Sequence, residues 1–175
     1  MRPISLKSAP LATTAAVTFG LDQLTKWAVV FGLDLQNRGE IDVLPPLLTF
    51  RMAWNEGVNF GLLAQHGDLM RWILIAVALA ISTWVFVWVR REAAGTPGQI
   101  AAGLLIGGAL GNVVDRLAYG AVADFLNMSC CGFENPYAFN LADIAIFAGA
   151  LGLVLFTGKP APKPGSGRKP RRNSP

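Results

Sequence analysis

Long apolar stretches alternate with short polar connections along this chain. Four of the stretches have about the 20 residues that a helix needs to cross the hydrocarbon core of a bilayer, at roughly 9–31, 69–89, 98–117 and 139–157. Charged residues are too few and too unevenly spread for a soluble domain with one large core. The pattern therefore predicts an all-α membrane protein with four transmembrane helices.

The connection between the first two stretches contains a segment with a different period. From Leu48 to Asn55, apolar side chains alternate with polar or small ones, which is typical of a strand with one apolar face. The apolar positions are Leu48, Phe50, Met52 and Trp54. We therefore expect a small β-sheet, forming a cradle, between helices one and two.

The run from Asn55 to Gly61 follows this strand and begins Asn55-Glu56-Gly57. Its glycines and asparagines permit tight turns and positive backbone dihedral angles. An ordinary hairpin turn and a binding loop explain the composition equally well, so the pattern alone leaves both open.

The positive charges mark the orientation in the membrane. Cytoplasmic flanks of short loops are enriched in Lys and Arg. On one predicted side of the membrane lie Arg2, Lys7, Arg90, Arg91, Lys159, Lys163, Arg168, Lys169, Arg171 and Arg172. Both termini should therefore be cytoplasmic, with the connections 34–68 and 118–138 outside. The net charge of +4 follows from this topology and requires no nucleic-acid partner.

The first apolar stretch could also be a cleaved signal peptide, because Arg2 and Lys7 precede it. The stretch lacks a convincing cleavage site before Asp22, and it continues through Trp27 to Leu33. We therefore expect the first helix to be retained.

The last residues differ in composition from the rest of the chain. Residues 158–175 are rich in Pro, Gly, Lys and Arg, which predicts a disordered, basic cytoplasmic tail. Such a tail either touches anionic lipid headgroups or simply keeps the end of the chain soluble. Residues 1–157 are then a single membrane domain.

Two helices carry short-range patterns that indicate packing. Asp22 and Lys26 are four residues apart and can form an ion pair on one face of helix one, with Lys26 extending outwards to the membrane surface. In helix three, Gly103, Gly107 and Gly111 are spaced four apart, which removes side chains from one face and lets another helix approach closely.

The end of helix three and the start of helix four carry a second group of polar residues. Asn112, Asp115 and Arg116 share a helix face, and Asp115 could simply neutralise Arg116. Helix four opens with Asn140 and Asp143, three residues apart, so both can point into the bundle. These residues should lie at one depth, near the outer edge of the membrane.

Asp124 and Asp143 are the candidates for chemistry. An ionised carboxylate in or near hydrocarbon is costly and usually marks function, although Asp124 alone could also be a helix N-cap or a surface residue. Two carboxylates held close together cannot both ionise cheaply, so one keeps a proton while the other activates water. That arrangement suits amide hydrolysis. The only histidine, His66, and the adjacent cysteines 130–131 have no metal-binding spacing, so we predict no metal site.

In five blocks the sequence resembles the lipoprotein signal peptidases, also called signal peptidase II, which are membrane aspartic proteases of bacteria. The blocks are Asp22-Gln23-Leu24-Thr25-Lys26, Asn55-Glu56-Gly57 with Phe60-Gly61, the segment from Gly107 to Arg116, Val122-Ala123-Asp124-Phe125, and Phe139-Asn140-Leu141-Ala142-Asp143. They occur in the family's order, and the resemblance covers about residues 11–157.

The resemblance implies a catalytic dyad of Asp124 and Asp143. The orienting residues would be Asn112, Arg116 and Asn140, while Asn55 and Gly57 would belong to the extracytoplasmic cradle. The implied substrates are prolipoproteins carrying diacylglyceryl-cysteine, cut just before that cysteine. No metal or organic cofactor is implied. We expect a monomer in contact with membrane lipids, located in the bacterial inner membrane with its active site near the extracytoplasmic face.

Two other functions use similar residues. A proton-coupled transporter also relies on buried carboxylates, but it would prefer acids near the bilayer midplane and discontinuous helices. A non-catalytic assembly factor would use the glycine face for partner helices and leave the two aspartates unexplained.

Overall fold

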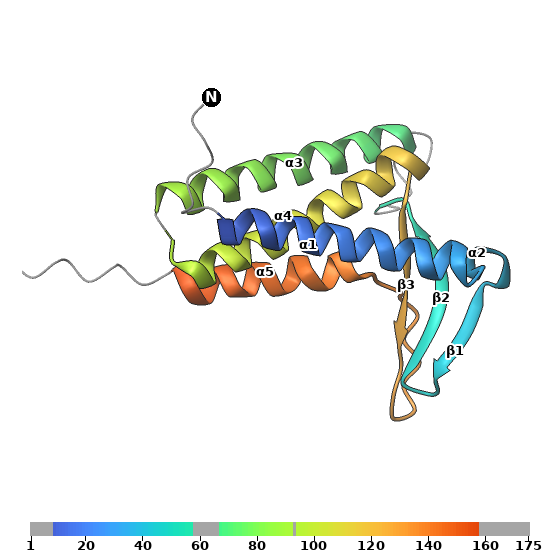
Figure 1. Ribbon diagram of the computed structural model, residues 1–175. Coiled ribbons are helices and arrows are strands. Elements are labelled where there is room, and N and C mark those ends of the chain that lie inside the picture. The colour runs from blue at the N-terminus through green and yellow to red at the C-terminus, as the bar shows by residue number, and fades with distance from the viewer. Residues whose placement is uncertain (1–8, 58–66, 93, 158–175) are drawn as a thin grey trace, which may run out of the picture.

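The computed structural model describes residues 9–57, 67–92 and 94–157, which form a helix bundle with a small sheet at one end (Figure 1). The long helices are α1 (Ala9–Lys26), α3 (Gly67–Arg91), α4 (Thr96–Tyr119) and α5 (Leu141–Thr157). The predicted tail 158–175, together with Arg2, Lys7, Phe60, Gly61 and His66, lies outside the described residues.

By length and composition, α3 and α4 are apolar enough to cross a membrane, and α5 is apolar but has 17 residues. α1 continues without a break into the π-helical turn η2 (Trp27–Gly32). Asp22, Gln23 and Lys26 lower the hydropathy of α1. The helical architecture is as predicted, while the count of four spans still rests on the sequence pattern.

α4 is the central helix and contacts α1, α3 and α5. Its glycines allow this, as predicted. A Cβ atom added at Gly103 would lie 2.7 Å from the carbonyl oxygen of Leu11, and one at Gly107 would lie 2.5 Å from that of Ala15. On the opposite partner, a Cβ atom at Gly149 of α5 would lie 2.6 Å from the carbonyl oxygen of Ala101. The backbones of three helices are therefore in direct contact.

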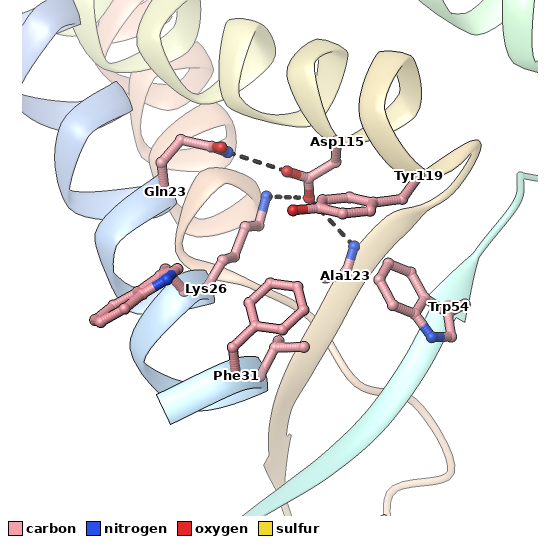
Figure 2. Close-up of a pocket in the computed structure, with 9 residues that line it drawn as sticks. Gln23, Lys26, Phe31, Trp54, Asp115, Tyr119 and Ala123 are labelled. Carbon is pink, nitrogen blue, oxygen red and sulfur yellow. Dashed lines mark hydrogen bonds and ion pairs between the residues drawn. The ribbon is translucent and has the colours of Figure 1, made fainter. Parts of the chain in front are cut away.

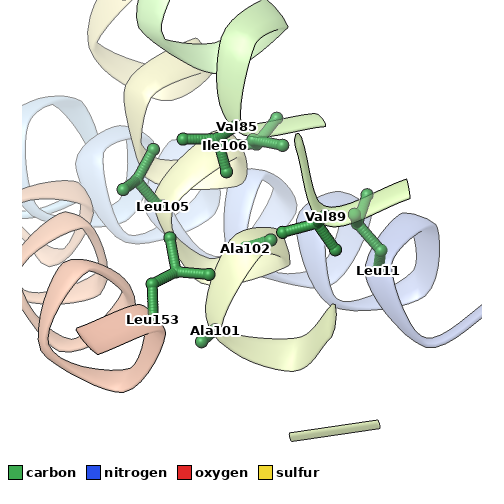
Figure 3. Close-up of a cluster of buried hydrophobic side chains, with 8 residues drawn as sticks. All are labelled: Leu11, Val85, Val89, Ala101, Ala102, Leu105, Ile106 and Leu153. Carbon is green, nitrogen blue, oxygen red and sulfur yellow. The ribbon is translucent and has the colours of Figure 1, made fainter. Parts of the chain in front are cut away.

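The apolar core has two parts. One joins all four long helices at the end away from the sheet (Figure 3), and it consists of Leu11, Val85, Val89, Ala101, Ala102, Leu105, Ile106 and Leu153. The other lies where η2 and the short helix α2 (Leu35–Arg38) meet the sheet, and it consists of Val29, Val30, Leu35, Ala123 and Phe125. The second cluster anchors the sheet to the bundle.

The sheet has three antiparallel strands in the order β1 (Glu40–Leu44), β2 (Leu48–Asn55) and β3 (Val122–Met128). The predicted strand is confirmed as β2. The prediction confined the sheet to the connection between the first two helices, and this is wrong because β3 follows α4. That third strand brings Asp124 into the sheet.

A register shift interrupts the apolar face of β2. Phe50 pairs with Leu126 and Ala53 with Asp124, so β2 takes three steps where β3 takes two. The extra residue is a β-bulge, which reverses the alternation beyond it. Trp54 consequently leaves the face of Phe50 and is 43% exposed, so the prediction of one apolar face is wrong for Trp54.

Candidate active site

The predicted polar residues converge where the end of α4, strand β3 and the start of α5 meet, at the sheet end of the bundle (Figure 1). Each element contributes for a local reason. α4 ends at Gly120, whose positive φ of 83° stops the helix and turns the chain into β3. α5 begins directly after Asn140. The site therefore lies between two helix ends and a strand.

Asn140 and Asp143 cap the start of α5. The Asp143 N–H donates to Asn140 Oδ1 at 2.9 Å, and the Asn140 N–H donates to Asp143 Oδ2 at 3.2 Å. This is a reciprocal capping box, which satisfies two backbone donors that the helix itself leaves unpaired. The sequence placed Asn140 inside helix four, whereas it is the N-cap residue. Both side chains are fixed as a result.

Asp124 lies on β3 and is only 3% exposed, so neither a helix N-cap nor a surface residue describes it. Its Oδ1 accepts a 2.6 Å hydrogen bond from Asn140 Nδ2, and its Oδ2 accepts one of 3.1 Å from Asn55 Nδ2. Asn55 shares a face with Asp124 because Asn55 pairs with Val122 beyond the bulge. Asn140 therefore contacts both aspartates, because its side chain donates to Asp124 and its backbone N–H donates to Asp143.

Gly57 explains why the Asn55 amide nitrogen faces Asp124. The Gly57 N–H donates to Asn55 Oδ1 at 3.0 Å, which leaves the amide nitrogen to point at the carboxylate. Gly57 has a φ of 107°, and a Cβ atom there would lie 2.6 Å from Leu74 Cδ1. A larger residue would disturb the turn. The hydrogen bond between Gly57 and Asn55 therefore orients a site residue, while residues 58–61 of the predicted run lie outside the described residues.

Burial and, second, the neighbouring charge of Asp143 raise the pKa of Asp124 to about 6, against the opposing hydrogen bonds from Asn55 and Asn140 and the charge of Lys26. The ordinary value is 3.8. At neutral pH such a pair holds a proton more readily than two separate carboxylates would. Asp143 is half-buried, so part of its side chain remains exposed.

Asn112 and Arg116 connect α4 to the aspartates. Asn112 Nδ2 donates to Asp143 Oδ1 at 2.9 Å, and Asn112 Oδ1 accepts from Asn140 Nδ2 at 3.3 Å. Arg116 donates through Nη1 to the Asn112 carbonyl oxygen at 3.3 Å, and its charge acts on both Asp124 and Asp143. Its buried Nε has no hydrogen-bond partner among the described residues, so one donor remains for another acceptor.

The predicted Asp22–Lys26 ion pair is confirmed, with Lys26 Nζ 2.9 Å from Asp22 Oδ2. Lys26 does not extend outwards, however, and is 5% exposed. Asp115 attracts it inwards at 2.7 Å, so the prediction that Lys26 snorkels is wrong (Figure 2). Asp115 forms its ion pair with Lys26, and its charge also acts on Arg116. Asp115 also accepts the Ala123 N–H at 3.2 Å, which ties α4 to β3.

Gln23 is the site residue that the sequence analysis missed. Its Nε2 donates to Asp115 Oδ1 at 3.0 Å (Figure 2) and to the carbonyl oxygen of Gly111 at 3.3 Å. Gln23 stands inside the first matched block, and a polar amide in an apolar helix was the available signal.

In the described part of the chain, no group of three or more His, Cys, Asp or Glu side chains is arranged to hold a metal ion.

Two cavities adjoin the network. A groove of about 250 Å³ between α3, α4 and α5 is lined by Leu74, Val77, Ala78, Ile81, Leu105, Ala109, Asn112, Arg116 and Ile146. It is apolar except where Asn112 and Arg116 close it. A second cavity of about 140 Å³ lies beside Lys26 and Asp115 and is walled by the rings of Phe31, Trp54 and Tyr119 (Figure 2).

The arrangement is suited to acid–base chemistry. Two carboxylates face a common asparagine, one is buried in surroundings that favour its protonated form, and amide donors and a guanidinium surround the pair. Such a pair can hold one proton and accept another.

Sequence comparison with known proteins gives the family that the five sequence blocks resemble. The family model for signal peptidase (SPase) II matches residues 14–158. A lipoprotein signal peptidase of Methylorubrum extorquens (strain PA1) is 46% identical over 146 residues, covering 83% of this chain and 84% of the relative. That of Methylobacterium radiotolerans is 44% identical, with 89% and 86% covered.

Solved structures agree on the fold. A bacterial membrane enzyme determined by the in meso method at 2.3 Å resolution has a TM-score of 0.68 and 25% identity, covering 83% of this chain and 85% of that one. A second, at 1.9 Å, has a TM-score of 0.72 and 24% identity, covering 86% and 94%. On the matching family model and the identity to these relatives, the chain belongs to the signal peptidase II family.

Proposed function

We propose that Asp124 and Asp143 are the catalytic dyad of a membrane aspartic endopeptidase. Its substrates are prolipoproteins carrying diacylglyceryl-cysteine, and it cuts just before that cysteine. The observation that carries the proposal is the position of Asn140, whose side chain donates to Asp124 and whose backbone N–H donates to Asp143. Membership of a peptidase family favours this function over the proton-coupled transporter.

The mechanism uses one shared proton. The ionised aspartate accepts a proton from water while the water oxygen attacks the scissile carbonyl carbon, and the protonated aspartate gives its proton to the carbonyl oxygen. The resulting tetrahedral intermediate, a gem-diol, collapses when the leaving nitrogen takes a proton from one aspartate and the C–N bond breaks. A hydroxyl proton of the diol passes to the other aspartate, which forms the carboxylic acid product and restores the single shared proton. The two carboxyls titrate as a unit, so their apparent pKa values belong to the pair.

The surrounding residues have separate roles in this scheme. Asn55 and Asn140 hold the Asp124 carboxylate by its two oxygens, and Asn112 holds Asp143. Gly57 fixes Asn55. Arg116 brings a positive charge beside both aspartates and a buried Nε that no other described residue hydrogen-bonds, which suits a developing oxyanion.

The apolar groove between α3, α4 and α5 is suited to an apolar part of the substrate. Its polar end, at Asn112 and Arg116, adjoins the dyad. Two acyl chains anchor a peptide in a bilayer where one would hold it marginally. The diacylglyceryl group should therefore contribute more to recognition than the residues after the cut, and its binding energy would position the scissile bond.

The proposed topology has four spans in one domain, residues 1–157, with both termini and the basic tail 158–175 in the cytoplasm. The start of α1 and the end of α5 lie at the end of the bundle away from the sheet (Figure 1), as this topology requires. The dyad then lies near the extracytoplasmic face of the inner membrane. Reporters fused after Arg172 and at about Asp42 test it, since the first should be active only as a cytoplasmic fusion and the second only outside. We propose a monomer surrounded by lipid.

The test of the function compares purified wild type, Asp124→Asn and Asp143→Asn on one precursor with and without the diacylglyceryl group. Asparagine keeps the shape but cannot exchange a proton, so each variant should lose about 10²–10⁴ in kcat and still fold. Near-normal turnover by either variant would remove the dyad assignment. Equal kcat/KM for the lipidated and unmodified precursors would remove the lipid requirement alone.

A further inference from the structure

Lys26 is a buried ammonium that no step of the proposed reaction uses. Its Nζ lies 2.9 Å from Asp22 Oδ2 and 2.7 Å from Asp115 Oδ2. Lys26 Nζ also donates to a third acceptor, the amide oxygen Asn112 Oδ1, at 3.1 Å. An ion pair that served only to hold α1 against α4 would need the two carboxylates and no contact with Asn112. Asn112, the third partner, in turn donates a hydrogen bond to Asp143 of the dyad.

Asn112 has an amide that can be turned either way. In the observed orientation, Oδ1 accepts from Lys26 Nζ and from Asn140 Nδ2, and Nδ2 donates to Asp143 Oδ1. A half-turn of the amide would bring its NH₂ group against the ammonium and against a second amide NH₂ group. It would also set Oδ1 against the Asp143 carboxylate. All three contacts would then be repulsive, since ammonium and amide NH₂ groups are donors only.

We propose that Lys26 is a positioning residue for the dyad, whose ammonium fixes the Asn112 amide with its nitrogen towards Asp143. Asp22 and Asp115 hold the ammonium in place. A cation on Oδ1 also polarises the amide and strengthens the hydrogen bond that Nδ2 makes. The inference rests on the proposed function of Asp124 and Asp143, and it adds a role for a residue that the family resemblance leaves as structural.

The test must remove the ammonium without changing the net charge of the buried cluster, because a broken buried ion pair is strongly destabilising. The double variant Lys26→Gln/Asp115→Asn does this. One ammonium and two carboxylates give the wild-type cluster a formal charge of −1, and Asp22 alone gives the variant the same charge. Asp22 keeps its bonds from the Ala142 N–H at 2.9 Å and from Gln23 at 3.2 Å. A glutamine amide can present oxygen or nitrogen to Asn112, so the part of the selection that the ammonium contributes is lost, while Asn140 and Asp143 keep theirs.

We expect this variant to fold, to bind a lipidated precursor with unchanged KM, and to lose about tenfold to a hundredfold in kcat, the effect of one charge-assisted hydrogen bond. The alkaline limb of its pH–kcat profile should also move to higher pH, because the charge of Lys26 lowers the pKa of Asp124. The groups that act on Asp124 are Asp143 from α5, Arg116 from α4, Lys26 from α1, and the amides of Asn55 and Asn140. Of these, only Lys26 changes.

Glu40→Gln/Arg51→Gln is the matched control, because it removes one acid and one base from an exposed pair on the sheet. It should keep wild-type kcat and the wild-type pH profile. If Lys26→Gln/Asp115→Asn folds and keeps kcat within about twofold, the network is only structural and the inference is wrong. If it does not fold, Asp22→Asn/Lys26→Gln supplies the same measurement, and failure of both to fold also overturns the inference.

The dyad variants separate this inference from the function on which it rests. Inactive Asp124→Asn and Asp143→Asn, together with an unaffected Lys26 variant, would leave the dyad in place and remove only the positioning role. Active dyad variants would remove the proposed function itself, whatever the Lys26 variant does.

Discussion

The two ends of the helix bundle are held together by different physics. Away from the sheet, the contacts are made by aliphatic side chains and by glycines that let backbones touch, as in the cluster around Ala102 and Leu105 (Figure 3). At the sheet end, buried Asp22, Lys26 and Asp115 form a network of charges and amides. The same helices, α1, α4 and α5, take part in both.

The difference shows what each kind of contact can fix. Close packing of small residues sets the distance between helix axes, and between helices in a membrane it substitutes for the missing hydrophobic driving force. It cannot choose which way a carboxylate or an amide points. Hydrogen bonds are directional, and at the sheet end they fix the side chains of Asn112, Asn140 and Asp124. The proposed catalytic residues lie at the sheet end, where hydrogen bonds fix the directions of the side chains.

Among variants outside the dyad, the largest effect should follow from Asn140→Ala, because Asn140 contacts both aspartates at the sheet end. Asp124 would lose a 2.6 Å donor, and α5 would lose its cap. We expect kcat to fall about 10²–10³-fold, as when a donor in a catalytic site is removed, and stability to fall by about 1 kcal/mol. Peptidase kinetics and thermal unfolding in detergent measure the two effects.

Asn127→Ala is the matched control for that variant. Asn127 is also buried, but its Nδ2 donates to the carbonyl oxygens of Asn135 and Tyr137, away from the dyad. It should lose a similar amount of stability and little activity in the folded protein. An equal loss of kcat in both variants would mean that any buried asparagine here acts through folding alone.

The packed end is tested by Gly107→Ala. A Cβ atom would lie 2.5 Å from the carbonyl oxygen of Ala15 and 2.9 Å from Thr18 Cβ, and helix backbone cannot give way easily. We expect a loss of stability of about 1–3 kcal/mol, typical of overpacking, with kcat of the remaining folded protein unchanged. Gly20→Ala in α1 meets nothing within 4 Å and should be neutral or stabilising. Similar melting temperatures for the two variants would contradict the packing argument.

The sequence predicts contacts that are local and misses those that depend on register. Asn140 with Asp143 and Asp22 with Lys26 follow from helical spacing, and both pairs are present. Asp115 is 89 positions beyond Lys26, so spacing could not show that it turns the lysine inwards. Local patterns also could not separate the cap position of Asn140 from the first turn of the helix.

The sheet shows the same limit. β2 has the alternation that marks a strand, whereas β3 is buried along most of its length and contains Asp124, so no alternation appears. The bulge between Phe50 and Ala53 decides that Asn55 shares a face with Asp124. That choice depends on pairing two segments about 70 residues apart, and no short-range pattern encodes it.

A moderate effect should follow from Asn55→Ala, together with a shift in pH dependence. Activity requires one protonated and one ionised member of the dyad. The charge of Asp143 helps to raise the pKa of Asp124 to about 6, so the shared proton is lost, and kcat should fall, as pH increases through about 6. The Asn55 hydrogen bond lowers that pKa, so its loss should move this alkaline limb to higher pH. Below the limb, kcat should fall about two- to tenfold, the effect of one ordinary hydrogen bond.

Asn37→Ala is the control for Asn55, since Asn37 Nδ2 donates to Asp34 Oδ1 on the surface. Its pH–kcat profile should overlay that of the wild type. An alkaline limb that does not move in Asn55→Ala would show that this hydrogen bond leaves the titration of the dyad unaffected.

The smallest effect should come from the exposed ion pair of the sheet, which contrasts with the buried pair of Lys26 and Asp115. Arg51 Nε lies 3.3 Å from Glu40 Oε2, with side chains 46% and 49% exposed. Such pairs contribute about 0–1 kcal/mol, because water screens the attraction and two long side chains lose freedom. A double-mutant cycle of Glu40→Gln and Arg51→Gln, followed by thermal unfolding, should give a coupling below about 1 kcal/mol that shrinks as salt rises through about 0.15 M to 1 M.

The corresponding cycle for Lys26→Gln and Asp115→Asn should give a larger coupling that salt hardly changes, since both groups are buried. A surface coupling as large as the buried one would contradict the view that charge contributes to this structure mainly where the side chains are buried.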